Sequence, residues 1–75
     1  MWKEGVIGIY GTPYHYWIKV YEEGSVFGIE GGRICKLTIK REGQTVCRYD
    51  RGWDLEPVDE PTQLAYEILV HTENW

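Results

Sequence analysis

The chain has 75 residues, of which 43% are hydrophobic and 15% aromatic, and its formal net charge is −4. These values exclude a disordered chain, which is poor in apolar and aromatic residues, and the length allows one core and one domain over residues 1–75. No apolar run approaches the ~20 residues that a membrane-spanning helix needs. The first residues also lack the basic and apolar blocks of a signal peptide. We therefore expect one cytoplasmic domain that does not enter a membrane.

The N-terminal third predicts a β-hairpin. Residues 6–10 form a short apolar run, residues 11–13 (Gly-Thr-Pro) are turn formers, and residues 14–21 are almost all aromatic or β-branched. Residues 22–32 contain four glycines, and their path stays open. Within them, residues 26–29 form either a short edge strand or a packed loop.

Residues 33–40 alternate between two faces, which is typical of a half-buried strand. We expect Cys35, Leu37 and Ile39 to face the core, with Arg33 at the end of that face. The opposite face would carry Ile34, Lys36, Thr38 and Lys40.

A turn at Glu42-Gly43 predicts the pairing of this strand with residues 44–49. A type I turn closed by a glycine bulge would pair Lys40 with Gln44 and Leu37 with Cys47. Cys35 and Cys47 would then lie diagonally on the buried face, beyond comfortable disulfide reach. We therefore expect two buried, reduced thiols.

Glu60-Pro61 marks the start of a helix, because proline is favoured at the first helical position. The apolar spacing predicts a helix over residues 61–73 with a core stripe of Leu64, Ala65, Ile68 and Leu69. The expected fold is α+β, an antiparallel sheet of four to five strands over residues 5–53. A crossover at residues 54–60 leads to the one C-terminal helix, in the order ββ(β)ββα.

One helix covers only one face of such a sheet, so the other face is a candidate ligand surface. It would carry His15, Trp17, Lys19 and Tyr21, together with Ile34, Lys36, Thr38, Lys40, Val46 and Arg48 from the next two strands. Aromatic rings stack on bases and cations neutralise phosphates, so this face suits an anionic nucleotide or a single-stranded nucleic acid. The alternative is that two sheets pack face to face in a homo-oligomer, since large apolar patches mark interfaces.

Residues 49–54 form the densest polar and aromatic cluster. We expect Asp50 and Asp54 to hold Arg51, with Trp53 stacked on its guanidinium. The cluster either grips a phosphate or clamps the crossover to the helix. The candidate ligand-binding residues are Trp17, Tyr21, Lys36, Arg48, Arg51 and Trp53.

The helix offers a second candidate surface. Residues 54–75 carry six acidic residues and no Lys or Arg, and Tyr66 and Val70 are spaced i, i+4 away from the predicted core stripe. This pair would either dock a host protein or simply stabilise the helix. The acidic C-terminal third also disfavours duplex DNA as a partner.

The sequence lacks the patterns of common catalytic and metal sites. His15 and His71 lie on different predicted elements, and no HExxH, phosphate-loop or GxSxG pattern occurs. Both cysteines are predicted to be buried rather than accessible nucleophiles. We therefore expect no enzymatic activity, no metal and no cofactor.

Two stretches, GGRICKLTI at residues 31–39 and YDRGWDLEP at residues 49–57, carry a family resemblance that extends over about residues 14–70. The chain resembles a family of very small uncharacterised proteins of Gram-positive bacteria and their phages. The resemblance implies an accessory protein that acts by stoichiometric binding in the host cytoplasm. The leading hypothesis is a homo-oligomeric counter-defence protein that sequesters a nucleotide signal. The alternatives are a protein inhibitor or adaptor acting through the helix, and single-stranded nucleic-acid binding on the open sheet face.

Overall fold

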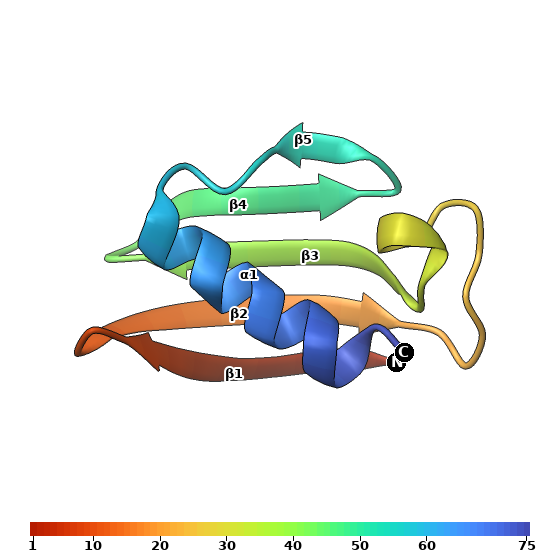
Figure 1. Cartoon of the computed structure of the whole chain (residues 1–75), viewed down its shortest axis with the longest axis horizontal. Helices are drawn as coiled ribbons and strands as arrows, with labels where there is room; N and C mark the ends of the chain where they lie inside the picture. The colour runs from red at the N-terminus through yellow and green to blue at the C-terminus, as the bar shows by residue number, and fades with distance from the viewer.

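The computed structural model describes all residues, 1–75, and shows one antiparallel sheet crossed on one face by one helix (Figure 1). Five strands lie side by side in chain order, β1 to β5. The elements are β1 (Trp2–Ile9), β2 (Thr12–Val20), the 3-10 turn η1 (Ile29–Gly31), β3 (Ile34–Arg41), β4 (Gln44–Asp50), β5 (Trp53–Leu55) and α1 (Glu60–Glu73). The predicted α+β fold, with a C-terminal helix on an antiparallel sheet, is confirmed.

The first hairpin is longer than predicted. β1 begins at Trp2, and its register runs without a break from the pair Trp2 and Lys19 to the pair Ile9 and Thr12. The turn consists of Tyr10 and Gly11, both with positive φ (50° and 80°), as a type I′ hairpin turn requires. An asparagine or glycine is the usual first residue of such a turn, so Tyr10 gives no sequence signal for it.

Residues 21–33 form a loop that contains η1, so the loop alternative for residues 26–29 is the correct one. The loop is packed onto the domain. Ile29 is buried in the core, and the Tyr49 hydroxyl donates to the Phe27 carbonyl at 2.9 Å. A side chain at Gly28 would collide with the Gly32 carbonyl, which explains one of the glycines in this segment.

The β3–β4 hairpin corrects the predicted register. The turn has two residues, Glu42 and Gly43, with φ of 52° and 79°, and it brings Arg41 opposite Gln44. Leu37 therefore pairs with Tyr49, and Cys47 pairs with Ile39, two residues from the predicted partners. Because the slip is by two residues, Cys47 and Tyr49 stay on the buried face of the hairpin.

Two strand irregularities move predicted outer residues into the core. Val46 is the extra residue of a bulge between the pairs Ile39–Cys47 and Lys40–Thr45, and it is buried together with Cys47. Ile34 follows a register shift beside Val20 and is also buried. The prediction that Ile34 and Val46 lie on the uncovered face is therefore wrong.

The predicted crossover contains the fifth strand. Residues 53–55 form β5, which pairs antiparallel with β4, and the connection to the helix is confined to residues 56–59. The three residues of β5 are all exposed to some degree, so they lack the apolar alternation that would have identified a strand.

The helix begins one residue earlier than predicted and is rotated about its axis. Asp59 caps its N-terminus by accepting a 3.0 Å hydrogen bond from the Thr62 amide. The residues facing the sheet are Thr62, Ala65 and Leu69, which are buried, with Leu64, Tyr66 and Val70 packed against the core. Ile68, a predicted core residue, is 43% exposed. In this orientation Tyr66 packs against Trp53 on the unpredicted β5, at 5.3 Å between ring centroids.

The core lies between the helix and the sheet. Cys35 and Cys47 are both buried and free, as predicted. The one helix is too short and too polar to cross a bilayer.

Candidate functional site: the outer face of the sheet

The face of the sheet opposite α1, here called the outer face, is covered by no other element of the fold (Figure 1). Alternation along β1 and β2 places Trp2, Trp17 and Lys19 on it, while Ile18 and Val20 point into the core. Lys40 on β3 belongs to the same face, and so does Tyr21, whose ring lies beside Lys19. We call these five residues the aromatic–basic platform.

Cations and aromatic rings are interleaved in the platform. The Lys19 ammonium lies 5.7 Å from the centroid of the Trp2 ring and 5.5 Å from that of Tyr21. The Lys40 ammonium lies 5.8 Å from the Trp17 ring. These are cation–π distances, and neither ammonium takes part in an ion pair. Both charges therefore stay available to an anion.

His15 extends the aromatic part of this face. Its ring stacks on Trp17 with 4.1 Å between centroids and 21° between planes. The Nε2 atom of His15 lies 2.8 Å from a carboxylate oxygen of Glu4 on β1. This contact orients the imidazole, and the imidazole in turn supports one side of the Trp17 indole.

The remaining basic residues of the outer face are held by acids. Arg48 lies 3.1 Å from Asp54 and 4.0 Å from Asp50. Lys36 lies 3.8 Å from the same Asp50. Two of the predicted ligand residues, Lys36 and Arg48, are therefore on the expected face but are largely neutralised there.

A shallow hollow lies within the outer face. It has a volume of about 400 Å³ and is lined by Trp2, Trp17, Thr38, Lys40, Thr45 and Arg48. Its walls offer two indoles, two hydroxyls and two cations, and it is open to solvent rather than enclosed. Such a surface can accept a planar group against the indoles and an anionic group beside Lys40.

Arg51 and Trp53 do not join the other predicted ligand residues. Trp53 lies on the helix side of the sheet, where its ring packs edge-on against Tyr49 at 5.2 Å and tilted against Tyr66. Arg51 lies in the β4–β5 turn, and its nearest acid is Asp50 at 3.9 Å. The expected clamp, in which Asp50 and Asp54 hold Arg51 under Trp53, is therefore not formed.

Tyr66 and Val70 are half-buried, and both also line a hollow of about 300 Å³ on the helix side. Both pack against the core, and burial raises the pKa of the Tyr66 hydroxyl to about 12, with Glu30 adding to the effect. Their predicted position away from the core is corrected by the rotation of α1, which places one side of each residue against the core.

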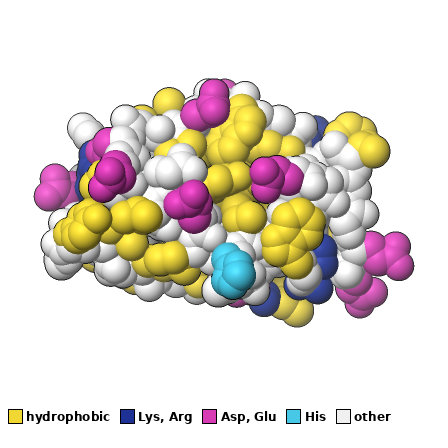
Figure 2. Space-filling model, viewed as in Figure 1, with side chains coloured by type: hydrophobic (Ala, Val, Ile, Leu, Met, Phe, Trp, Pro, Cys, Tyr) yellow, Lys and Arg dark blue, Asp and Glu magenta, His cyan; other side chains and the backbone are white.

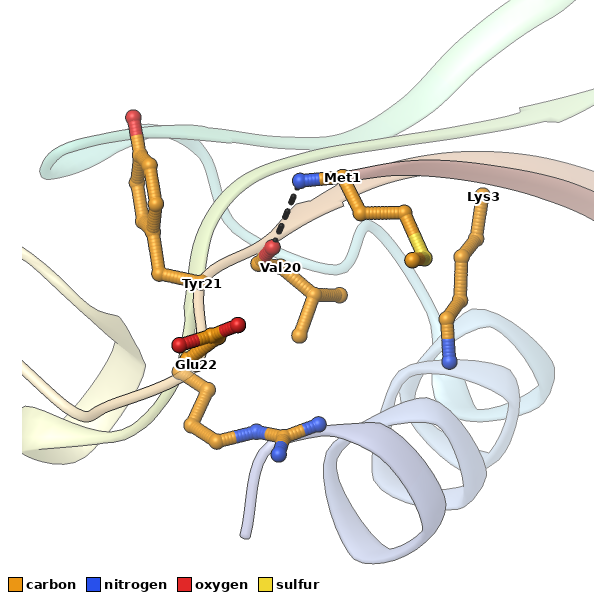
Figure 3. A pocket seen from close by; sticks show the side chains of 6 residues that line it. Met1, Lys3, Val20, Tyr21 and Glu22 are labelled. Carbon is orange, nitrogen blue, oxygen red and sulfur yellow. Dashed lines mark hydrogen bonds between the residues drawn. The ribbon is translucent and has the colours of Figure 1, made fainter.

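A second hollow, of about 370 Å³, lies where β1 and β2 meet the loop after β2. Figure 3 shows its lining, with Lys3 pointing towards the helix and Tyr21 pointing away from it. Lys3 is held by Glu73 at 2.7 Å, and the ammonium of Met1 donates to the Val20 carbonyl at 2.8 Å. The polar groups of this hollow are thus largely engaged within the fold, and it offers no indole beside its cations.

The candidate ligand residues predicted from sequence include Trp17 and Tyr21 but leave out the other three platform residues, Trp2, Lys19 and Lys40. Trp2 was missed because the first strand was expected to start at residue 6. The available signal was the alternation of side chains along a strand, because Trp2 and Val6 are an even number of positions apart and so lie on the same face of β1. Lys40 was placed on the correct face, but its proximity to Trp17 depends on the diagonal between two strands.

No cluster of three or more His, Cys, Asp or Glu side chains is arranged to hold a metal ion. No curated protein and no solved structure matches the chain. One family model does match, over residues 1–74, which is almost the whole chain. The protein therefore belongs to the family described as a domain of unknown function, DUF7678.

Proposed function

We propose that the protein is a non-catalytic binding protein whose aromatic–basic platform binds single-stranded nucleic acid. The observation that carries the proposal is the pairing of two indoles that line the hollow of the outer face with lysines that have no acidic partner. Trp2 lies beside Lys19, and Trp17 beside Lys40. Stacking on an aromatic ring contributes about 1–3 kcal/mol per base, and lysines neutralise the neighbouring phosphates.

The shape of the outer face favours an extended strand over a free nucleotide. Sites for small molecules usually bury about 70–90% of the ligand surface, whereas the hollow beside Trp17 is shallow and open. A single base on this surface would keep one face in water. A strand of several nucleotides adds further contacts along the sheet, so its affinity rises with length.

The distribution of charge supports a ligand on this side of the sheet. The opposite side carries several carboxylates on and around α1, as Figure 2 shows. The platform lysines are on the outer face, and Thr38 and Thr45 add hydroxyls between the strands. An anionic strand would therefore bind the outer face and be repelled from the helix side.

Fluorescence anisotropy of labelled oligonucleotides tests the proposal. We expect single-stranded oligonucleotides to bind more tightly as they lengthen, and a duplex and a free cyclic dinucleotide to bind more weakly. Trp17→Ala should weaken binding about 5- to 150-fold, the equivalent of one lost stacking contact. Trp75→Ala is the matched control, because Trp75 is exposed beside the helix, on the other side of the sheet.

The salt dependence separates the roles of the lysines. Each phosphate contact contributes about −0.7 to the slope of log K against log salt for a single strand. Lys19→Ala/Lys40→Ala should therefore flatten the slope by about 1.4, whereas Lys36→Ala, which removes a lysine already held by Asp50, should change it little. Failure of every single-stranded oligonucleotide to bind would refute the proposal. Preferential binding of the cyclic dinucleotide would replace it with nucleotide sequestration.

A further inference from the structure

β1 is a free sheet edge of eight residues, paired only with β2. Met1 and Val20 exchange both backbone hydrogen bonds, each at 2.8 Å. In an antiparallel ladder such pairs alternate with non-bonded ones, so Lys3, Gly5, Ile7 and Ile9 also bond to β2. Trp2, Glu4, Val6 and Gly8 therefore direct their N–H and C=O groups away from the sheet.

We propose that a second copy of this chain pairs with that edge, β1 against β1, about a two-fold axis perpendicular to the sheet. A closed dimer requires this antiparallel arrangement, because each strand then makes the same contacts as the other. The product is a continuous ten-stranded sheet with both helices on the same face.

The hydrogen-bonding groups select one register. With Gly5 of each copy on the axis, Trp2 pairs with Gly8 of the second copy and Glu4 pairs with Val6. All four residues that point outward then find partners. In the neighbouring register with Glu4 on the axis, Gly8 has no partner. The two Glu4 carboxylates then lie side by side, which is destabilising. A shift the other way places Trp2 opposite Tyr10, which lies in the turn with φ of 50°.

The side chains of the outer face fit the same register. Trp2 is 58% exposed and Val6 is 61% exposed, although they stand on a regular strand. Gly8 has open space where a side chain would be. The Trp2 indole of one copy therefore covers the bare backbone at Gly8 of the other, a pairing of aromatic and glycine that stabilises sheets.

An apolar groove opens along the same edge on the helix side. It has a volume of about 630 Å³ and is lined by Ile9 of β1 and by Leu64, Glu67, Ile68, His71 and Thr72 of α1. Figure 2 shows hydrophobic side chains gathered there, beside the β1–β2 hairpin. Because the two-fold axis keeps both helices on one face, the groove of each copy faces the α1 side of the other, which would bury Ile68.

β1 lacks two of the features that protect sheet edges from pairing. It has no proline and no bulge. Its inward lysine, Lys3, does not stand free, because Glu73 holds it at 2.7 Å. The other edge strand, β5, has only three residues and offers much less to pair with.

Sedimentation velocity over a concentration series tests the dimer. We expect the wild type to shift from monomer to dimer and Val6→Pro to remain monomeric, since proline removes an outward N–H that the fold itself does not use. Val26→Pro is the control. Val26 is the second residue of the turn closed by the 3.0 Å bond from the Gly28 amide to the Ser25 carbonyl, where proline is favoured. A wild type that stays monomeric at every concentration overturns the proposal, and so does a Val6→Pro protein that dimerises like the wild type.

A disulfide trap decides the register and remains informative where Val6→Pro fails to fold. In the proposed register positions 4 and 6 of opposite copies lie about 5.5 Å apart at Cα, within disulfide reach. Glu4→Cys/Val6→Cys should give a covalent dimer on mild oxidation, whereas Glu4→Cys/Gly8→Cys should not. Absence of the first product, or equal yields of both, contradicts the register. These outcomes do not depend on oligonucleotide binding, which is tested at Trp17 and Lys40 on β2 and β3, away from the β1 edge.

Discussion

The Arg41 guanidinium lies 2.7 Å from the Asp59 carboxylate and so joins the end of β3 to the start of α1. The same guanidinium donates to the hydroxyl of the buried Tyr14 at 2.9 Å. The other oxygen of Asp59 accepts from the Thr62 amide and hydroxyl. Hydrogen bonds from Thr62 and then Arg41 lower the pKa of Asp59 to about 2.

The first prediction concerns stability at acid pH. The pKa of Asp59 is lower in the folded state than its ordinary 3.8, so its contribution is complete above pH 3.8 and is lost as the pH falls towards 2. Asp59→Ala, which also loses the helix cap, should lower Tm by several degrees at neutral pH and little at pH 2. Asp59→Ser, which restores an N-cap hydroxyl without the ion pair, should recover part of the loss.

Thermal unfolding followed by circular dichroism between pH 2 and pH 7 measures this difference. Glu67→Gln, a change of one exposed carboxylate on the same helix, serves as the control and should leave the acid branch of the curve unchanged. If Asp59→Ala and the wild type keep the same separation in Tm at every pH, the Asp59 carboxylate is not the titrating group.

Asn74 is predicted to hold the loop between β2 and β3. Its buried side chain accepts from the Ile34 amide at 2.8 Å and donates to the Ile29 carbonyl at 2.9 Å. Asn74→Ala would leave both backbone groups buried without partners, at about 1–3 kcal/mol for each. Asn74→Asp keeps the acceptor for Ile34 but loses the donor, so its destabilisation should be large as well.

Urea unfolding compares these two variants with Glu67→Gln, a change at an exposed residue of α1 that makes no ion pair. Loss of only a few tenths of a kcal/mol in Asn74→Ala would show that water replaces the amide at both positions. The wild-type loop should also resist proteolysis at residues 22–28, and cleavage there should rise in Asn74→Ala.

The sheet and the helix were predictable because their signals are local. The alternation of residues 33–40 and the proline at the start of α1 are each readable within one element. The role of Asn74 is not readable in this way, because its two partners lie 40 and 45 residues away in the chain. In the sequence, an asparagine after a helix indicates only that the helix ends there.

The candidate site was predictable in part for the same reason. Alternation along β2 correctly separates Trp17 and Lys19 from Ile18. Neither the bulge at Val46 nor the positive φ of Glu42 is marked by a glycine or asparagine at that position. The strand register of β4, and the face of the sheet on which its side chains lie, could therefore not be predicted from the sequence pattern. β5 went unpredicted, and with it the placement of Trp53 and the rotation of α1.

Trp53 and Trp17 should behave oppositely on substitution. Trp53 packs against Tyr49 and Tyr66, and aromatic pairs contribute about 0.5–1.5 kcal/mol each beyond burial, so Trp53→Ala should lower the free energy of unfolding by about 1–3 kcal/mol. It should leave oligonucleotide affinity unchanged in the folded protein. Trp17→Ala should show the reverse, a small change in unfolding and a large one in binding. Equal losses of affinity in both variants would contradict the assignment of the site to the outer face.

The last prediction concerns the thiols. Cys35 and Cys47 are buried and free, and desolvation, with a smaller effect of Glu56, raises the pKa of Cys47 to about 12. A thiol that stays protonated inside the fold but ionises near pH 9 in the unfolded chain contributes stability that is complete below pH 9 and is lost as the pH rises towards 12. Wild-type stability should therefore fall as the pH rises from 9 towards 12, and the stability of Cys47→Ala should fall less steeply, although this variant is less stable at pH 7.

Thiol labelling tests the burial of both cysteines. A disulfide-exchange reagent should label both thiols rapidly in urea. In the native protein at pH 8 it should label them only slowly, at a rate set by the unfolding equilibrium. Rapid labelling of one thiol without urea would show that a cysteine is reached by local opening and not by global unfolding.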